Sequence, residues 1–280
     1  MKSRRAAAAL LLLLLASLAP QALADAYVYI DAFDYEVFEE EGNPVPFSSS
    51  KSGTTGKYVL GYGGSVELRA GPGGVCTDVY GGDALGTVRV DSVSWSVTIE
   101  VFFIDLSTGL GSWQSVKTWS DSVSSIATAT YTYPVPADFI GPTKYASYTA
   151  PSSRRYPAWV RISYSISARG QLSGKNIRIG GGGRIAADIR SGIVKQLAVL
   201  NVRARTTDGS SISVTVSYSG TVSGSASTPF TLYGVGRGLS VTLTAPASSG
   251  DYEFDHWEVD GGTYTSRTVT VSVPLGGSRT

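Results

Sequence analysis

The stretch Val93-Ser94-Trp95-Ser96-Val97-Thr98-Ile99-Glu100-Val101-Phe102-Phe103 decides the fold of this chain. Large apolar side chains occupy its odd positions, while Ser, Thr or Glu occupies the even positions from 94 to 100. Because successive side chains of a β-strand point to opposite faces, this alternation predicts a long strand with one buried face and one wet face. Hydroxyl residues on the wet face are typical of an antiparallel sheet that is half exposed.

The same two-residue period recurs in residues 160–167 and 211–218. Runs rich in β-branched and aromatic residues, separated by Gly, Ser, Asp and Pro, predict further strands. These lie near 27–33, 58–61, 66–70, 125–133, 230–233, 239–244, 252–259 and 267–273. Only residues 185–196 could hold a short helix, and they fit a strand equally well. The sequence therefore predicts an all-β protein.

The first 24 residues have the order of a secretory signal peptide. A basic start with Lys2, Arg4 and Arg5 precedes an apolar run, and the small-residue sequence Ala22-Leu23-Ala24 ends the segment. An uncleaved N-terminal anchor is the alternative. We predict a signal peptide at 1–24, an antiparallel β-sandwich domain at 25–195 and a smaller β-sandwich domain at 196–280.

Two segments between the strands are predicted to be irregular. The stretch Pro134–Pro157 contains five prolines and is expected to form a long loop or crossover outside the sheets. The glycine run Gly180–Gly183, followed by residues 185–196, is interpreted as the link into the second domain.

The charge balance argues against two classes of partner. The chain has 23 basic and 22 acidic residues, and removing the three basic residues of the signal leaves 20 against 22, a net charge of −2. That balance gives no electrostatic reason to expect nucleic acid or an anionic membrane surface. No apolar stretch after the signal is long enough to span a membrane.

Cys76 is the only cysteine, so we expect a hydrophobic core rather than internal disulfides to hold the exported protein together. The residue lies in the glycine-rich segment 71–82, which is predicted to be a loop, and a cross-link between two chains is the alternative reading of Cys76.

Short motifs in residues 199–280 carry a family resemblance. They are Leu200-Asn201-Val202, Asp208-Gly209, Thr228-Pro229-Phe230-Thr231-Leu232, 241–246, Tyr252-Glu253-Phe254-Asp255-His256-Trp257 and Asp260-Gly261. On these motifs the segment resembles the PEGA-like and Ig-like repeat modules of exported and surface proteins of archaea and bacteria. The resemblance implies a small binding or spacer sandwich that begins a strand after Thr-Pro and carries no catalytic residues.

Such modules usually close with one more strand, whereas this sequence ends at Ser278-Arg279-Thr280. An open sheet edge invites pairing with another strand. Residues 26–38 are apolar on both faces and are one candidate donor, by strand exchange between copies. The alternative is that they form an ordinary first strand inside their own domain.

Candidate catalytic and metal-binding residues are few. His256 is the only histidine and lies in a predicted strand beside Trp257. No serine in a G-x-S-x-G motif is present for which it could act as the catalytic base. We predict no catalytic residue and no cofactor, and the enzymatic alternative is a carboxylate pair. One histidine and one distant cysteine cannot supply the ligands of a zinc site. Calcium fits the sequence better than catalysis, because its hard oxygen ligands suit Asp-rich turns. Its weak candidate ligands are Asp31, Asp34, Asp255 and Asp260.

Tryptophans supply the candidate binding surface. In a single strand over residues 113–119, Trp113 and Trp119 would share one polar face, where flat indoles bind sugars or make protein contacts. The alternative is that each indole plugs one end of a sheet. Trp159 beside Arg161 fits a contact patch or a plug equally well.

The sequence thus predicts a secreted, non-enzymatic structural or adhesive protein of the cell surface, in an archaeal or bacterial envelope. Its expected partners are other envelope proteins or further copies of itself, without nucleic acid and without a membrane span after signal cleavage. A carbohydrate- or peptide-binding module of an extracellular degradative system is the first alternative. An extracellular hydrolase is the second.

Overall fold

The computed structural model describes residues 25–280, except 38–39, 80–84, 133–138, 153 and 176. The predicted signal peptide at 1–24 lies outside the described residues. All regular elements of the described residues are β-strands, and the predicted all-β fold is confirmed. None of these residues forms a helix with the length and apolar character that crossing a bilayer requires.

Sheet A has the strand order β1-β10-β4-β8, with β5 also paired to β10. Its strands are β1 (Ala26–Val37), β4 (Ser65–Gly71), β5 (Gly74–Val79), β8 (Lys144–Thr149) and β10 (Ile177–Arg190). All pairings in the sheet are antiparallel. Strand β10 is central, because β4 and β5 flank successive parts of one side of it and β1 flanks the other.

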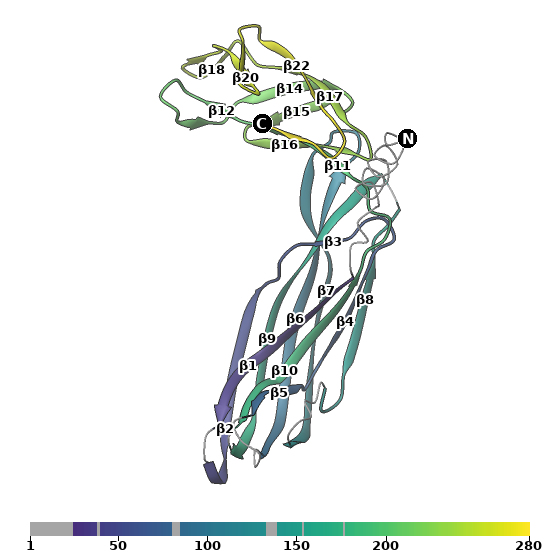
Figure 1. Ribbon diagram of the computed structural model, residues 1–280, viewed down its shortest axis with the longest axis vertical. Helices are drawn as coiled ribbons and strands as arrows, with labels where there is room; N and C mark the ends of the chain where they lie inside the picture. The colour runs from purple at the N-terminus through teal and green to yellow at the C-terminus, as the bar shows by residue number, and fades with distance from the viewer. Residues whose placement is uncertain (1–24, 38–39, 80–84, 133–138, 153, 176) are drawn as a thin grey trace, which may run out of the picture.

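Sheet B has the order β2-β9-β6-β7, with β3 also paired to β9. Its strands are β2 (Glu40–Thr54), β3 (Tyr58–Val59), β6 (Leu85–Asp105), β7 (Gly111–Thr132) and β9 (Arg155–Lys175). Strands β6, β7 and β9 contain 21, 22 and 21 residues. At about 3.3 Å per residue each spans roughly 70 Å, and Figure 1 shows them running the length of the larger part of the molecule.

One hydrophobic cluster joins the inner faces of sheets A and B. Ile30, Leu68 and Ile185 enter it from sheet A, whereas Trp95 and Ile162 enter it from sheet B. The odd-numbered residues of the 93–103 stretch are buried as their alternation predicts. The two sheets therefore pack as the layers of a sandwich, held by apolar side chains that point inward from both.

The C-terminal residues build two smaller sheets around a second hydrophobic cluster, which includes Leu200, Leu232 and Val271. Sheet C has the order β16-β11-β23 and sheet D the order β15-β14-β17-β22. Their strands are β11 (Leu197–Val202), β14 (Thr215–Gly220), β15 (Gly224–Ser227), β16 (Phe230–Val235), β17 (Leu239–Thr244), β22 (Thr268–Val273) and β23 (Ser278–Arg279). Figure 1 places this part at one end of the long strands.

Three two-stranded hairpins complete the C-terminal part. They pair β12 (Ala204–Arg205) with β13 (Ser211–Ile212), β18 (Ser248–Ser249) with β19 (Tyr252–Glu253), and β20 (Trp257–Val259) with β21 (Gly262–Tyr264). The single strand predicted at 252–259 is therefore wrong, because β19 and β20 are separate and have different partners.

The interpretation of Gly180–Gly183 as a domain link is wrong. These glycines lie inside β10, and the strand continues to Arg190, so the helical alternative for residues 185–196 is wrong as well. Gly181 has a φ of 131°, and a Cβ built on it would meet the carbonyl oxygen of Gly73 at 2.4 Å. Glycine is needed here because β5 approaches β10 so closely, and not because the chain leaves the sheet.

Two segments predicted to be loops contain strands. Within the proline-rich stretch Pro134–Pro157, β8 occupies Lys144–Thr149 and β9 begins at Arg155. Within the glycine-rich segment 71–82, β5 occupies Gly74–Val79, and the backbone of Cys76 pairs with that of Ile179. Pro142 and Pro151 flank the edge strand β8, whereas Pro157 lies inside β9 at a register shift, and a missing N–H donor is tolerated at both kinds of position.

The N-terminal strand pairs within its own sheet, as the simpler of the two alternatives expected. Strand β1 runs antiparallel to β10 from Ala26 to Val37, with a bulge between Asp31 and Phe33. The last residues of the C-terminal part are also paired, because Ser278 and Arg279 lie parallel to Val199 and Leu200 of β11. Strand exchange from residues 26–38 is therefore not required to complete sheet C.

Candidate functional site

The outer face of sheet B carries rows of serine and threonine that cross all four of its long strands. The register aligns Thr54-Ser163-Thr98-Thr118, Ser52-Ser165-Ser96-Ser120, Ser50-Ser167-Ser94-Ser122 and Ser48-Arg169-Ser92-Ser124. We call the hydroxyl residues of these rows the hydroxyl face. Residues directly opposite in a pair share a face, so the alternation within each strand produces one continuous surface.

Hydrogen bonds between neighbouring strands tie this face together. The hydroxyl oxygens are separated by 2.8 Å in Ser94–Ser167, 2.9 Å in Ser120–Ser96, 3.0 Å in Thr54–Ser163 and 3.3 Å in Thr98–Thr118. A hydroxyl has one proton to donate and two lone pairs that accept. Each pair therefore keeps acceptor capacity for a partner above the sheet.

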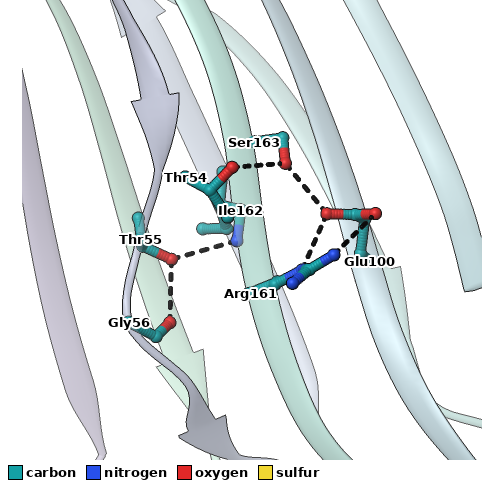
Figure 2. Close-up of polar contacts among 7 residues, drawn as sticks. All are labelled: Thr54, Thr55, Gly56, Glu100, Arg161, Ile162 and Ser163. Atoms are coloured by element: carbon teal, nitrogen blue, oxygen red, sulfur yellow. Dashed lines mark hydrogen bonds and ion pairs between the residues drawn. The ribbon is translucent and has the colours of Figure 1, made fainter. Parts of the chain in front are cut away.

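A carboxylate lies at one border of the hydroxyl face, in the network drawn in Figure 2. Glu100 accepts hydrogen bonds from Arg161 Nε at 2.9 Å and Nη2 at 3.4 Å, and from Ser163 Oγ at 2.9 Å. Since Ser163 gives its only proton to Glu100, the hydroxyl of Thr54 must be the donor in its 3.0 Å contact with Ser163. The polarity runs from Thr54 through Ser163 to Glu100.

Thr55, the residue that follows β2, fixes the backbone beside this network. Thr55 Oγ1 accepts a hydrogen bond from Ile162 N at 3.0 Å and donates to the carbonyl of Gly56 at 3.0 Å (Figure 2). The backbone N–H of Thr55 in turn donates to the carbonyl of Ile162 at 2.9 Å. These contacts continue the pairing to β9 just after β2 ends, so the hydroxyl face is anchored at its outer strand.

The environment of Glu100 keeps it ionised. The hydrogen bond from Arg161 lowers the pKa of this carboxyl, with smaller help from Ser163 and from the Arg161 charge, while partial burial opposes the shift. A catalytic general acid needs the opposite change, a raised pKa that retains the proton near neutral pH. The chemistry of Glu100 is therefore that of a hydrogen-bond acceptor that orders its neighbours.

Replacing Glu100 with glutamine should make stability less dependent on pH. A lowered pKa stabilises the fold above pH 4.5, the ordinary value, and this contribution is lost as the pH falls through the folded-state pKa. We expect Glu100→Gln to lower the free energy of unfolding by about 1 kcal/mol at pH 7, with the difference vanishing in acid. Urea unfolding at several pH values measures this, with Glu253→Gln as an exposed control. A constant difference at all pH values would contradict it.

Aromatic side chains border the hydroxyl face toward the C-terminal part. The ring centroid of Phe102 lies 5.4 Å from Trp113 and 5.2 Å from Trp159, and the Arg161 guanidinium stands 4.3 Å from the Trp113 centroid. Tyr233 of β16 closes the group at 5.8 Å from Phe102 and 6.1 Å from Trp159. Trp113 and Trp159 are both half-buried, and Trp159 joins the two parts of the molecule through its contact with Tyr233.

Trp119 does not share a face with Trp113, so the prediction of two indoles on one polar face is wrong. The register pairs Trp113 with Phe102 but Trp119 with Val97, which is buried. A bulge between the pairs Ile99–Lys117 and Glu100–Ser115 inserts Val116 and reverses the side-chain parity. Trp119 therefore packs on the core, with its ring centroid 5.6 Å from that of Trp95.

The candidate calcium ligands face cations or a neighbouring imidazole. Asp31 pairs with Arg184 at 2.6 Å, Asp260 pairs with Arg279 at 3.2 Å, and Asp255 lies 2.8 Å from His256 Nδ1. The side chain of Asp34 lies outside the described set, although its backbone pairs with Gly180. Across the described parts of the chain, no three His, Cys, Asp or Glu side chains gather as a metal site.

His256 lies between β19 and β20 rather than within one predicted strand. Hydrogen bonds to Asp255 and then to Glu258 raise the pKa of its imidazole. The two partners of the imidazole, Asp255 and Glu258, are carboxylates, so these contacts form a surface charge cluster. Comparison of the chain with protein-family models, with curated proteins and with solved structures finds no match.

Proposed function

We propose that this protein is a non-enzymatic structural or adhesive component outside the cell, and that the hydroxyl face is its contact surface. Export rests on the sequence of residues 1–24, and the Ig-like or PEGA-like assignment of the C-terminal part belongs to the same proposal. The single observation that carries it is the alignment of Ser and Thr across four strands into one array, in which Arg169 is the only charged position of the four rows.

The extent of the hydroxyl face supports adhesion to an extended partner. Small-molecule sites are concave and mostly apolar, whereas a pleated sheet face offers many equivalent polar groups in one plane. Each net hydrogen bond contributes about 0.5–1.5 kcal/mol, so many contacts add up even though each is weak. Contacts made by the hydroxyls are also insensitive to salt, and Arg169 is the one position of the four rows at which an ion pair could be screened.

The size of the face indicates that it works in repeated contacts. Three strand spacings and six residue steps give about 14 Å by 20 Å, or roughly 300 Å² between the outermost Cα positions. A stable interface buries about 800 Å² per partner. One hydroxyl face therefore binds weakly, and a layer or filament of many copies makes the binding effective.

The edges of sheet B favour contact through the face instead of through added strands. Lys117 and Asp121 of β7 pair with Ile99 and Trp95, and Lys51 of β2 pairs with Ile166, so these exposed charges stand on the core side of the two edge strands. Inward-side charges and bulges at edges prevent strands of other molecules from pairing there. The partner is therefore expected on the open face.

Electron microscopy of concentrated protein tests the proposal. We expect filaments or sheaths from the wild type, and their loss in Ser96→Lys/Ser165→Lys, which places two charges at the centre of the hydroxyl face. Thr270→Lys on sheet D is the matched control, because it also adds a lysine to an exposed strand hydroxyl. A wild type that stays monomeric at high concentration and forms no assembly would overturn the proposal.

A further inference from the structure

The outer face of sheet A differs from the hydroxyl face because it is hollowed and aromatic. A groove of about 490 Å³ lies there, lined by Tyr27, Glu67, Leu68, Arg69, Tyr145, Ala146, Ser147 and Asp188. We call it the tyrosine groove. Its volume falls within the range of ligand sites of about 300–1,000 Å³.

The register explains how the groove is built. One row of the outer face reads Tyr27-Asp188-Glu67-Ser147 and the next reads Tyr29-Ala186-Arg69-Tyr145, in each case from β1 across β10 and β4 to β8. The tyrosines thus stand on the two outermost strands, and the charged residues stand on the two strands between them. Three strand spacings separate β1 from β8, about 14 Å, which is the width of an extended oligomeric ligand rather than of one small molecule.

The aromatic walls are open to solvent. Tyr27 is 48% exposed and Tyr145 is 70% exposed, although both are large and partly apolar. Ala186, which lies between them in the second row, is 1% exposed, so the accessible surface at this point comes from the tyrosines and the charged side chains. Exposed tyrosines that combine an apolar ring with a polar tip are characteristic of recognition surfaces.

Polar contacts fix the Tyr27 wall and the floor of the groove. Arg69 donates a hydrogen bond to the hydroxyl of Tyr27, and its guanidinium stands 5.0 Å from the ring centroid of Phe139. Asp188 accepts from Arg190 Nη2 at 2.9 Å. A wall residue fixed before binding loses little conformational entropy on binding, which favours affinity.

The charges in and beside the groove are balanced. Glu67 and Asp188 are directly opposite each other on the floor, Arg69 is the one cation of the lining, and Arg190 outside the lining pairs with Asp188. A strongly cationic or anionic ligand would gain no net attraction from this set. The groove still offers both acceptors and donors, which is what a ligand rich in neutral hydroxyl groups requires.

We propose that the tyrosine groove binds a neutral oligosaccharide. Sugar rings have one face rich in C–H groups that can lie on Tyr27 and Tyr145, and hydroxyls at their edges that can bond to Glu67, Asp188 and Ser147. The groove lies on sheet A and the hydroxyl face on sheet B, so this binding is separate from the assembly proposed above.

Isothermal titration of the purified protein with soluble tetrasaccharides of neutral glucose, xylose, mannose and N-acetylglucosamine tests this inference. We expect at least one to bind, with affinity reduced at least tenfold in Tyr145→Ala and less than threefold in Tyr145→Phe, which keeps the ring. Tyr252→Ala removes a tyrosine of similar exposure, 51%, far along the chain in β19, and should bind like the wild type.

Heparin tetrasaccharide and tetralysine serve as anionic and cationic probes in the same experiment. The inference is overturned if no neutral tetrasaccharide binds, if only a charged probe binds, or if Tyr145→Ala and Tyr252→Ala both bind the tetrasaccharide as tightly as the wild type. Thermal unfolding of each variant shows that the fold is intact. Failure here leaves the filament experiment unaffected, since that experiment changes residues of sheet B only.

Discussion

Replacing Asp31 with alanine should lower the free energy of unfolding by about 3–5 kcal/mol. Asp31 binds Arg184 through two contacts, Nε–Oδ1 at 2.6 Å and Nη2–Oδ2 at 3.0 Å. The side chain of Arg184 is only 5% exposed and its guanidinium stands 5.0 Å from the Tyr29 ring. Removal of the carboxylate takes two hydrogen bonds and one negative charge away from a buried cation, which is far more costly than the loss of a surface pair. Urea denaturation followed by tryptophan fluorescence measures the change.

Two comparisons isolate the buried charge as the cause. Asp91→Ala breaks the pair with Arg89, whose side chains are 38% and 40% exposed, and should cost less than about 1 kcal/mol. The double variant Asp31→Ala/Arg184→Met removes the charge together with its partner and should recover part of the lost stability. Equal losses in Asp31→Ala and Asp91→Ala, or a double variant below Asp31→Ala, would show that charge burial is not responsible.

The second large effect is expected from Gly181→Ala. A Cβ at this position would lie 2.4 Å from Gly73 O and 2.5 Å from Gly74 Cα, and the φ of 131° is one that only glycine adopts readily. Strain and overpacking together should lower the free energy of unfolding by about 2–5 kcal/mol. Shifts of the urea midpoint and of the thermal transition report this loss.

Gly209→Ala is the matched control for Gly181→Ala. Gly209 also has a positive φ, 87°, but nothing lies within 4 Å of the Cβ that alanine would add. Gly209→Ala should therefore lower the free energy of unfolding by about 1 kcal/mol, which is the cost of placing alanine at a positive φ without any steric clash. If the two variants are equally stable, β5 does not approach β10 as closely as the register of Gly74 and Gly181 requires.

The local sequence pattern was sufficient to predict strands in which apolar and polar residues alternate. It was insufficient where contact with a strand distant in the sequence determines the structure. The 93–103 run could be interpreted alone, because its own residues separate core from solvent. Gly181 could not, because a glycine inside a strand and a glycine in a linker look alike until the neighbouring strand is known. Strand β8 could not be predicted for a similar reason, since flanking prolines do not indicate whether an edge strand lies between them.

The candidate site shows the same division. The hydroxyls of β6 and β9 were predicted to be wet, but only the register joins Ser96 to Ser165 and to strands β2 and β7. The signal that could have indicated a shared face was the repeated alternation of Ser or Thr with apolar residues in several separate segments of the sequence. The opposite faces of Trp113 and Trp119 could not have been predicted, because the bulge at Val116 is visible only against β6.

The length of β6, β7 and β9 has a mechanical consequence. Their ladder hydrogen bonds lie perpendicular to the strands, so a pull directed along the strands loads a whole ladder in shear instead of opening one bond after another. Many bonds must then break together, and resistance to tearing grows with strand length. Long strands of this kind would transmit tension from one end of the ladder to the other without separating pair by pair.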